Sequence, residues 1–287
     1  MEKIDFIARC KEFDYSEILS GCVYESRLDL FVCDVLVVIP VRGRVAAVQA
    51  VIPSIHQACG NFKVGVILVE HSHEREHYVD GADYVWIKCD EHAPFNKCLA
   101  FNIGALRGIH SQWILAHDAD CMVQEYFFEK LFRNIEFKNT VAIQPFYNNR
   151  VLYCDEGVTN KLLNKQVDIN VLNEGSEGIF TVPGKAMGGS LMMTRDLFIK
   201  VGGYDPDLFT GYSPEDQFMW AKLSLFTDIP SCYNPRNEVF HLHHERMNNT
   251  NPELKRMIDI HHQFMALTTQ DKLQIINLKS EILKQWF

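Results

Sequence analysis

The sequence lacks the features that mark membrane-spanning, nucleic-acid-binding and zinc-binding chains. Its 287 residues include no uninterrupted apolar run of the roughly 20 residues that a helix needs to cross a bilayer. Lysine and arginine number 28 against 37 acidic residues, and the net charge of −9 argues against nucleic acid as a partner, because nucleic acid is met by basic surfaces. The nine cysteines form no Cys-x-x-Cys pair, so nothing indicates a zinc knuckle.

Two further absences concern the compartment and the ligand. Residues 1–5 lack the charged and then apolar pattern of a secretion signal. Scattered cysteines without such a signal are typical of reduced thiols, so we expect a cytoplasmic protein, and we interpret the glycosylation sequon at 248–250 as a chance match. No glycine-rich loop of the kind that holds a nucleoside triphosphate is present.

The chain does have enough apolar sequence for a folded core, with 47% hydrophobic and 11% aromatic residues. Its first half alternates apolar runs with stretches of helical periodicity. Strands are expected at 34–40, 62–69, 82–87 and 113–116, and helices at 45–59, with a kink or early stop at Pro53, and at 96–109. This alternation predicts an α/β fold with a mostly parallel central sheet flanked by helices.

The second half is less regular, and we expect one domain to continue through it. Residues 148–180 are polar and rich in turn residues, which predicts a mobile loop. Further elements are expected as helices at 125–137 and 196–201, a strand at 190–193, a helix that begins with a Ser213 cap, and helical structure over 254–287. The apolar stripe of that last segment is expected to face the core or a partner, and a peripheral membrane contact stays open.

The triplet Asp118-Ala119-Asp120 directly follows the fourth expected strand. Two acids at the end of a buried strand are unfavourable unless something binds them. Carboxylate oxygens bind Mg²⁺ or Mn²⁺, and such an ion can in turn bind the phosphate oxygens of a nucleotide. Ligands of parallel α/β sheets lie at the carboxyl ends of the strands, where this triplet is expected to meet Arg42 and Glu70.

Histidines gather at His241-Leu242-His243-His244, after another short apolar run. Imidazole nitrogens could complete a coordination sphere begun by Asp120, with His241 and His244 three positions apart on one side of a turn. The alternative is that these histidines are ordinary hydrogen-bonded surface residues. Spacing alone leaves both interpretations open.

Several other polar residues have both a structural and a chemical interpretation. Glu215 and Asp216 suit the first turn of a helix, and a carboxylate there could also act as a general base on an acceptor hydroxyl. Arg42 and Arg44 are either surface charges or contacts to phosphate, ribose or base. Asn96 fits a helix N-cap. The Gly188-Gly189 pair fits a tight turn or the close approach of a sugar to the backbone.

In their order along the chain, these segments resemble the GT-A glycosyltransferases, most closely the β-1,4-galactosyltransferase and chondroitin-polymerase-like group. The resemblance extends from about residue 34 to residue 250. The matching segments are Val38 to Arg44, Phe95-Asn96-Lys97 with Asn102-Ile103-Gly104, Asp118-Ala119-Asp120, Gly188-Gly189-Ser190, Gly211 to Asp216, and His241 to Arg246.

The resemblance implies a GT-A domain over 34–250, an N-terminal extension over 1–33 packed on it and a helical extension over 251–287. It also implies a metal-dependent inverting transfer of a hexose or N-acetylhexosamine from a UDP-sugar to a glycan hydroxyl, with Mn²⁺ or Mg²⁺ as cofactor. By that match Asp120, His241 and His244 hold the metal, with His243 the weaker candidate. Asp216 is the base, Glu215 binds sugar hydroxyls and Tyr212 stacks on the acceptor. The donor-binding residues are Pro40, Arg42, Arg44, Glu70, Asn96, Lys97, Asp118, Gly188 and Gly189.

Departures from the family pattern affect the donor and the acceptor. Lys97 replaces an arginine, and Ser213-Pro214 replaces a glycine pair. Ala186 stands where galactosyltransferases have a bulky tyrosine, which leaves room for an N-acetyl group, so UDP-GalNAc or UDP-GlcNAc is at least as good a candidate donor as UDP-Gal. The segment 245–252 is expected to close over the nucleotide and exclude water.

Three other functions stay open at this stage: a retaining GT-A N-acetylgalactosaminyltransferase, a catalytically idle module that binds carbohydrate or nucleotide, and a metal-dependent nucleotidyltransferase. Soluble or lipid-linked glycans are the expected acceptors, as in polysaccharide biosynthesis, by analogy with the family. The sequence predicts neither a transmembrane span nor an oligomeric state.

Overall fold

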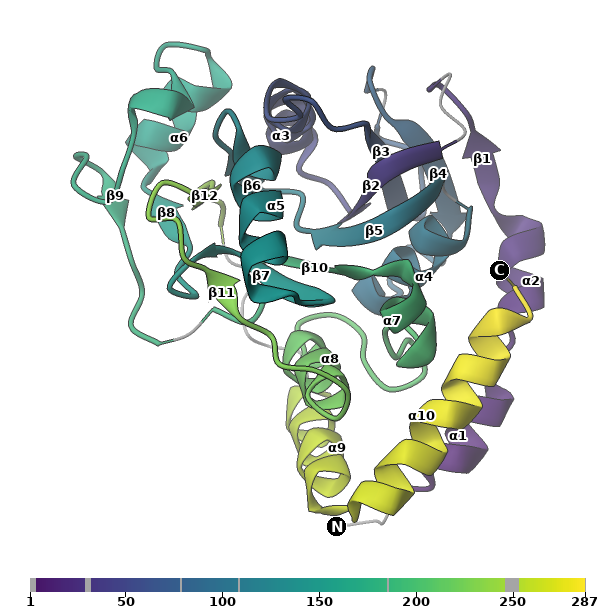
Figure 1. Cartoon of the computed structure of the whole chain (residues 1–287). Helices are drawn as coiled ribbons and strands as arrows, with labels where there is room; N and C mark the ends of the chain where they lie inside the picture. Colours follow the sequence, from purple (N-terminus) through teal and green to yellow (C-terminus); the bar gives the residue numbers. More distant parts are fainter. Residues whose placement is uncertain are drawn as a thin grey trace.

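The core of the protein is an eight-stranded mixed sheet (Figure 1). The structure is a computed structural model that describes residues 4–28, 32–77, 79–107, 109–184, 186–245 and 253–286. The strand order is β1-β4-β3-β2-β5-β10-β7-β11. The strands are β1 (Val23–Glu25), β2 (Val32–Val41), β3 (Val64–Ser72), β4 (Asp83–Lys88), β5 (His110–His117), β7 (Ala142–Tyr147), β10 (Ser190–Thr194) and β11 (Ser231–Cys232).

The four central strands β4, β3, β2 and β5 run parallel, as the apolar runs of the sequence predict. Strand β2 separates two hydrophobic cores, because successive side chains of a strand point to opposite faces. Val37 and Ile39 belong to one core, and Leu36 and Val38 to the other. Strands β1 and β10 pair antiparallel with their neighbours, so the sheet is mixed and its centre is parallel.

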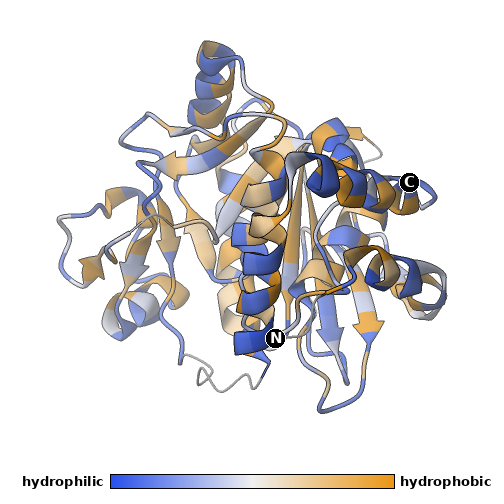
Figure 2. Cartoon of the chain, turned by 90° about the horizontal axis from the view of Figure 1, so that it is seen from below, coloured by the Kyte–Doolittle hydropathy of each residue, from blue (hydrophilic) through white to orange (hydrophobic). Residues whose placement is uncertain are grey.

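Helices cover both faces of this sheet. They are α1 (Phe6–Glu12), α2 (Tyr15–Gly21), α3 (Val45–Gln57), α4 (Lys97–Arg107), α5 (Phe127–Lys138), α6 (Glu156–Leu163), α7 (Arg195–Lys200), α8 (Glu215–Leu223), α9 (Leu254–Ala266) and α10 (Thr269–Lys284). Figure 2 shows hydrophobic residues concentrated on the central strands and hydrophilic residues on the outer turns of the helices. Among the described residues, no helix is both long and apolar enough to cross a membrane.

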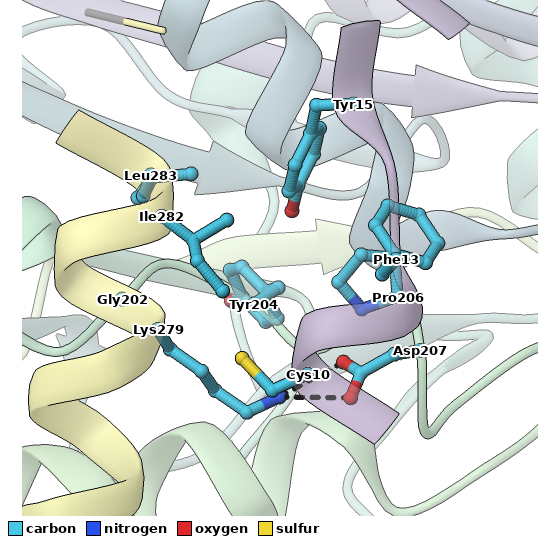
Figure 3. Close-up of a pocket in the computed structure, with 10 residues that line it drawn as sticks. All are labelled: Cys10, Phe13, Tyr15, Gly202, Tyr204, Pro206, Asp207, Lys279, Ile282 and Leu283. Atoms are coloured by element: carbon cyan, nitrogen blue, oxygen red, sulfur yellow. Dashed lines mark hydrogen bonds and ion pairs between the residues drawn. The ribbon is translucent and has the colours of Figure 1, made fainter. Parts of the chain in front are cut away.

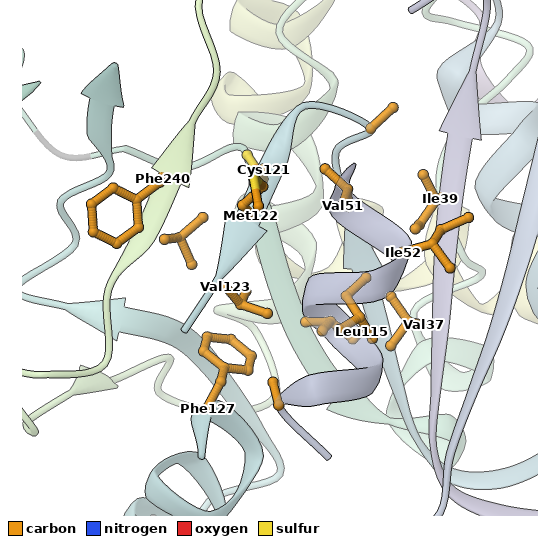
Figure 4. Packing of buried hydrophobic residues seen from close by; sticks show 14 of the residues in the cluster. Val37, Ile39, Val51, Ile52, Leu115, Cys121, Met122, Val123, Phe127 and Phe240 are labelled. Atoms are coloured by element: carbon orange, nitrogen blue, oxygen red, sulfur yellow. The ribbon is translucent and has the colours of Figure 1, made fainter. Parts of the chain in front are cut away.

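Helix α3 corrects one local expectation, since it continues through Pro53 to Gln57 instead of stopping early. Val51 and Ile52 are fully buried against Val37 and Leu115 of the sheet (Figure 4). Burial of such side chains contributes about 1.5–3 kcal/mol each, so packing on the sheet outweighs the one hydrogen bond that a proline removes.

The region 148–180 is not one long loop, and this is a second correction. It contains α6 and two strands of a separate four-stranded sheet, ordered β6-β12-β8-β9. Helix α6 begins at the N-cap Asp155, whose side chain accepts a hydrogen bond from Val158 N. The strands of the small sheet are β6 (Cys121–Val123), β8 (Leu152–Cys154), β9 (Ile179–Phe180) and β12 (Val239–His241).

The expected helical structure at the C-terminus is confirmed, and it is divided into two helices, α9 and α10. Helix α10 restarts at the N-cap Thr268, whose hydroxyl accepts a hydrogen bond from Asp271 N. In α10, the buried Lys279 pairs with Asp205 at 2.7 Å and with Asp207 at 2.8 Å. Figure 3 shows the pocket at this junction, where α10, α1 and the 202–207 segment meet. The two terminal segments therefore pack on the chain that leads to α8.

Candidate active site

The candidate site lies where β5 ends and the small sheet begins. After β5 the chain turns at 119–120, and the two ends of the triplet are tied to different segments. Asp118 N donates to the carbonyl of Gly189 at 2.9 Å, and Leu242 N donates to the carbonyl of Asp120 at 2.8 Å. These bonds bring the triplet, the Gly-Gly pair and the histidine segment together, although they are far apart in the sequence.

Asp120, His241 and His244 form a cluster whose ligand atoms all lie within 4.8 Å of one another. His241 Nε2 lies 3.5 Å from Asp120 Oδ1, and His244 Nε2 lies 3.5 Å from Asp120 Oδ2. These separations exceed those of a good hydrogen bond, and they suit atoms that bind one ion at about 2.0–2.2 Å each.

The surroundings of His244 also fit a metal ligand. Its Nδ1 donates to the carbonyl of Glu245 at 2.9 Å, which leaves the lone pair of Nε2 facing Asp120, the arrangement that orients ligating histidines. Burial, followed by the nearby charge of Arg44, lowers the pKa of His244 and favours the neutral imidazole. One carboxylate and two imidazoles form a donor set that suits Mn²⁺.

Arg44 reaches the same carboxylate from the loop after β2. Its Nη1 pairs with Asp120 Oδ2, the oxygen that His244 also faces. Arg44 has a left-handed backbone, with φ of 59°, at the N-cap of α3. Asp120 therefore receives three basic side chains from two separate segments of the chain, Arg44 from one and the two histidines from the other.

A second cluster surrounds Lys97 at the start of α4. Its Nζ lies 3.0 Å from Asp118 Oδ1, 3.2 Å from Glu215 Oε1 and 3.2 Å from Asp216 Oδ2. Burial works against the ammonium charge, but the three carboxylates outweigh it and hold the pKa of Lys97 well above its usual value. Lys97 thus contacts three of the predicted site residues.

The two aspartates beside Lys97 titrate in opposite directions. Burial, then repulsion from Glu215 and Asp118, raises the pKa of Asp216 to about 7 against the attraction of Lys97. Burial also opposes the charge of Asp118, yet Lys97 outweighs it and lowers the pKa of Asp118. At neutral pH Asp216 therefore exchanges protons readily while Asp118 stays ionised, and a pKa near the working pH is what a general base requires.

The glycine pair borders the same carboxylates. A Cβ on Gly188 would collide with the carboxylate of Asp216, so only glycine permits this close approach. Gly189 has a left-handed backbone with φ of 88°, and its carbonyl accepts the hydrogen bond from Asp118. Trp220 Nε1 of α8 donates to the carbonyl of Met187 at 3.1 Å, which fixes the glycine segment against α8.

Helix α8 starts one residue later than expected. Pro214 is the N-cap, and the expected Ser213 cap is wrong. The Ser213 hydroxyl donates to Glu215 Oε2 at 2.8 Å. Tyr212 lies just before this turn, and 63% of its surface is exposed.

The remaining predicted donor-side residues engage the protein itself. Arg42 donates to the carbonyls of His71 and Ala93, each at 2.6 Å. Asn96 Oδ1 accepts from Leu99 N at 2.9 Å, which confirms it as the N-cap of α4. Pro40 is buried in β2, beside β3.

Glu70 is fully buried and accepts four hydrogen bonds. They come from Ser72 Oγ at 2.7 Å, Glu76 N at 2.9 Å, His77 N at 3.3 Å and the Tyr84 hydroxyl. These four donors use the lone pairs of both carboxylate oxygens. Glu70 thus fixes the 72–77 loop beside the site.

Sequence reasoning missed three residues that support the site. The buried His117 bridges the hydroxyl of Ser190 and the carbonyl of Cys121, the latter at 2.7 Å. The ring of Tyr153 lies 4.9 Å from that of His241, and Tyr204 stacks on Phe101 at 4.7 Å. Each is a single aromatic or histidine residue that belongs to no recognisable motif, so the sequence alone gives no reason to select it.

The expected closing segment at 245–252 lies outside the described residues from 246 onward. His243 is exposed, and its backbone N–H donates to Thr159 Oγ1 at 2.8 Å. Within the described ranges it takes no part in the Asp120 cluster.

Sequence comparison finds no relative: no family model matches the chain, and a search of curated proteins gives no match. Solved structures do resemble it. GalNAc-T7 with UDP, GalNAc and Mn²⁺ aligns with a TM-score of 0.56 and 14% identity, over 88% of this chain and 55% of that one. S. aureus TarS 1–349 aligns with a TM-score of 0.51 and 10% identity, over 86% and 70%.

The catalytic domain of a Drosophila β1,4-galactosyltransferase 7 in complex with xylobiose also matches, with a TM-score of 0.47 and 12% identity over 74% of this chain and 71% of that one. At such identities a structural likeness concerns the fold. The likeness to GalNAc-T7 and TarS confirms the fold predicted from the sequence: an α/β chain of the GT-A type, with a largely parallel sheet flanked by helices.

Proposed function

We propose that this protein is a metal-dependent glycosyltransferase that moves a hexose or N-acetylhexosamine from a UDP-sugar to an acceptor hydroxyl with inversion. One observation supports this above all others. The two acids of the triplet enter two different clusters, Asp120 with two imidazoles and Asp118 beside Lys97 and Asp216. Metal binding and proton transfer are the two tasks that such a reaction needs.

The residues of the first cluster would hold the cofactor. Asp120, His241 and His244 supply an oxygen and two nitrogens that face one another, a set that fits Mn²⁺ better than Mg²⁺, because Mg²⁺ favours oxygen ligands. When bound, the ion would neutralise the diphosphate and stabilise UDP as it departs. Arg44 and Arg42, on the loop after β2, are proposed to face the nucleotide.

The second cluster would carry out the proton transfer. The acceptor oxygen attacks the anomeric carbon as the bond from that carbon to UDP breaks, and the hydroxyl proton passes to Asp216. A single displacement inverts the anomeric centre and forms no covalent intermediate. Lys97 holds the Asp216 carboxylate and Gly188 leaves room for it. Glu215 and the exposed Tyr212 are proposed to contact the sugars.

Ala186 supports a donor with an N-acetyl group. Its backbone is held on both sides, because its N–H donates to the carbonyl of Asn149 at 2.9 Å and its carbonyl accepts from the Gln144 amide. Because a methyl group is smaller than the tyrosine that galactosyltransferases have here, we propose that an N-acetyl group fits beside it. We therefore propose UDP-GalNAc or UDP-GlcNAc alongside UDP-Gal as donors, with a soluble or lipid-linked glycan as acceptor.

The test is a screen of UDP-sugars for Mn²⁺-dependent release of UDP, with and without glycan acceptors. Release that needs Mn²⁺ and is lost on chelation supports the proposal, and strict use of UDP-Gal would refute the donor preference. Product with a retained anomeric configuration would favour the retaining alternative. UDP binding without any turnover would indicate an idle binding module, and consumption of a nucleoside triphosphate would indicate a nucleotidyltransferase.

A further inference from the structure

We propose that the Arg44 guanidinium regulates the metal site by competing with the metal ion for the Asp120 carboxylate. It occupies the Asp120 carboxylate while no metal is bound, and it makes the metal ion and the nucleotide diphosphate bind cooperatively. This inference rests on the proposed function, because it assigns a regulatory contact to the same metal-binding residues.

The contacts of Asp120 show the competition directly. Arg44 Nη1 pairs with Asp120 Oδ2, and His244 Nε2 faces the same oxygen at 3.5 Å. The Asp120 side chain is only 9% exposed and that of Arg44 is 31% exposed. A divalent ion bound between Oδ2 and His244 would take the oxygen that Arg44 contacts, and at such short range it would repel the guanidinium strongly. Under this proposal the ion and Arg44 therefore compete for the same oxygen.

The backbone of Arg44 supports a functional role for this contact. Arg44 has φ of 59° and ψ of 31°, directly after Gly43 with φ of 64°. A non-glycine residue in the left-handed region is unfavourable and persists only where its surroundings enforce it. In the described part of the chain the guanidinium is paired with Asp120, so the loop holds a strained residue in the position that reaches the metal carboxylate.

Displacement of Arg44 explains the cooperativity. A metal ion that binds alone must break the Arg44 pair and leave a partly buried guanidinium without its anion. A nucleoside diphosphate that binds with the metal supplies a new anionic partner, because a guanidinium pairs well with phosphate. Each ligand therefore raises the affinity for the other, and by linkage the two effects are equal.

The experiment measures Mn²⁺ affinity of the full chain by the EPR signal of free Mn²⁺, with no nucleotide and with saturating UDP. It compares the wild type with Arg44→Gln and Arg44→Gly. The glycine variant removes the guanidinium and also relieves the left-handed strain, so the test does not depend on tolerance of glutamine there. Arg150→Gln is the matched control, since Arg150 pairs with Glu174 at 2.7 Å on the exposed surface.

Without UDP, both Arg44 variants are expected to bind Mn²⁺ about ten-fold more tightly than the wild type, the ratio that corresponds to loss of one charge-assisted contact. The factor by which UDP tightens Mn²⁺ binding should fall by about ten-fold or more. Arg150→Gln should match the wild type in both respects.

Equal Mn²⁺ affinity of the wild type and both Arg44 variants in the absence of UDP would overturn the inference and leave the proposed function intact. Failure of the proposed function has a different signature. In that outcome neither the wild type nor any variant, Asp120→Ala included, binds Mn²⁺ with or without UDP.

Discussion

Asp118 and Asp120 are one residue apart, yet they enter clusters of opposite chemical character. Asp118 joins two other carboxylates around a lysine, at distances of 3.0–3.2 Å. Asp120 joins two imidazoles at 3.5 Å and an arginine. In an extended strand both side chains would share a face, but the turn at 119–120 separates them. The two clusters therefore suit the two proposed tasks, proton transfer beside Asp118 and metal binding at Asp120.

The two clusters also differ in how their charge is balanced. Around Lys97 the acids outnumber the cation, and burial, together with the repulsion of these acids, raises the pKa of Asp216 to about 7. Around Asp120 the basic groups outnumber the acid. The cluster around Lys97 has a carboxylate that can accept a proton. The cluster around Asp120 is proposed to offer three ligands to a metal ion once Arg44 has left the carboxylate. Breaking each cluster separately should therefore affect different steps of the reaction.

The largest effect is expected from Asp216→Asn. The amide keeps the shape of the side chain but cannot take up the acceptor proton, so kcat should fall by about 10²–10⁴-fold. Affinities for Mn²⁺ and UDP should stay within about two-fold of wild type, because the Asp120 cluster is untouched. Steady-state kinetics and a calorimetric UDP titration check both statements, and retained turnover would remove Asp216 as the base.

Asp120→Ala breaks the other cluster and should act first on binding. Loss of the one carboxylate among the candidate ligands is expected to weaken Mn²⁺-dependent UDP binding by about 100-fold. Equilibrium titration of UDP at fixed Mn²⁺ is the measurement. An affinity equal to that of wild type would reject Asp120 as a ligand, whatever happened to turnover.

Lys97→Gln sharpens the comparison through pH. The general base must be deprotonated, so kcat/KM of the wild type should rise with pH to a plateau above a midpoint of about 7, the pKa of Asp216. Lys97 opposes this raised pKa, so its removal should move the midpoint upward by about one unit or more. Profiles of kcat/KM against pH test this, and an unchanged or lower midpoint would contradict the assignment.

Gly188→Ala should have the smallest effect, about ten-fold in kcat, because the added methyl displaces the Asp216 carboxylate without removing it. Gly157→Ala is the matched control, since its methyl would lie 3.4 Å from Asp155 Oδ1 in α6. Thermal unfolding of both variants separates a catalytic effect from a loss of stability. Equal kcat in Gly188→Ala and Gly157→Ala would show that the close approach has no role.

The parallel centre of the sheet could be predicted from the sequence because its strands are long and buried on both faces. Val35 to Ile39 are all fully buried, and a short apolar run rich in β-branched residues favours a buried strand. The small sheet could not be predicted, since β8 and β12 are three residues each and β9 is two. Strands this short have too few positions to show a period.

The resemblance grouped Asp120 with His241 and His244, and the structure brings these side chains together. The contacts of the second cluster could not be predicted. Lys97 and Glu215 are 118 positions apart, and no local pattern encodes their contact. The resemblance placed Lys97 beside the donor, and the structure adds that it contacts three carboxylates. The contact between Arg44 and Asp120 could not be predicted either, because it depends on the left-handed backbone of Arg44 in the loop after β2.

The most direct test of the account is pulsed EPR on Mn²⁺ bound to the protein in the presence of UDP. Nitrogen nuclei of directly bound imidazoles couple to the manganese electron spin. The account predicts couplings from two imidazoles in the wild type, and from one in either His241→Ala or His244→Ala. Bound Mn²⁺ with no nitrogen coupling, or a spectrum that both substitutions leave unchanged, would contradict it.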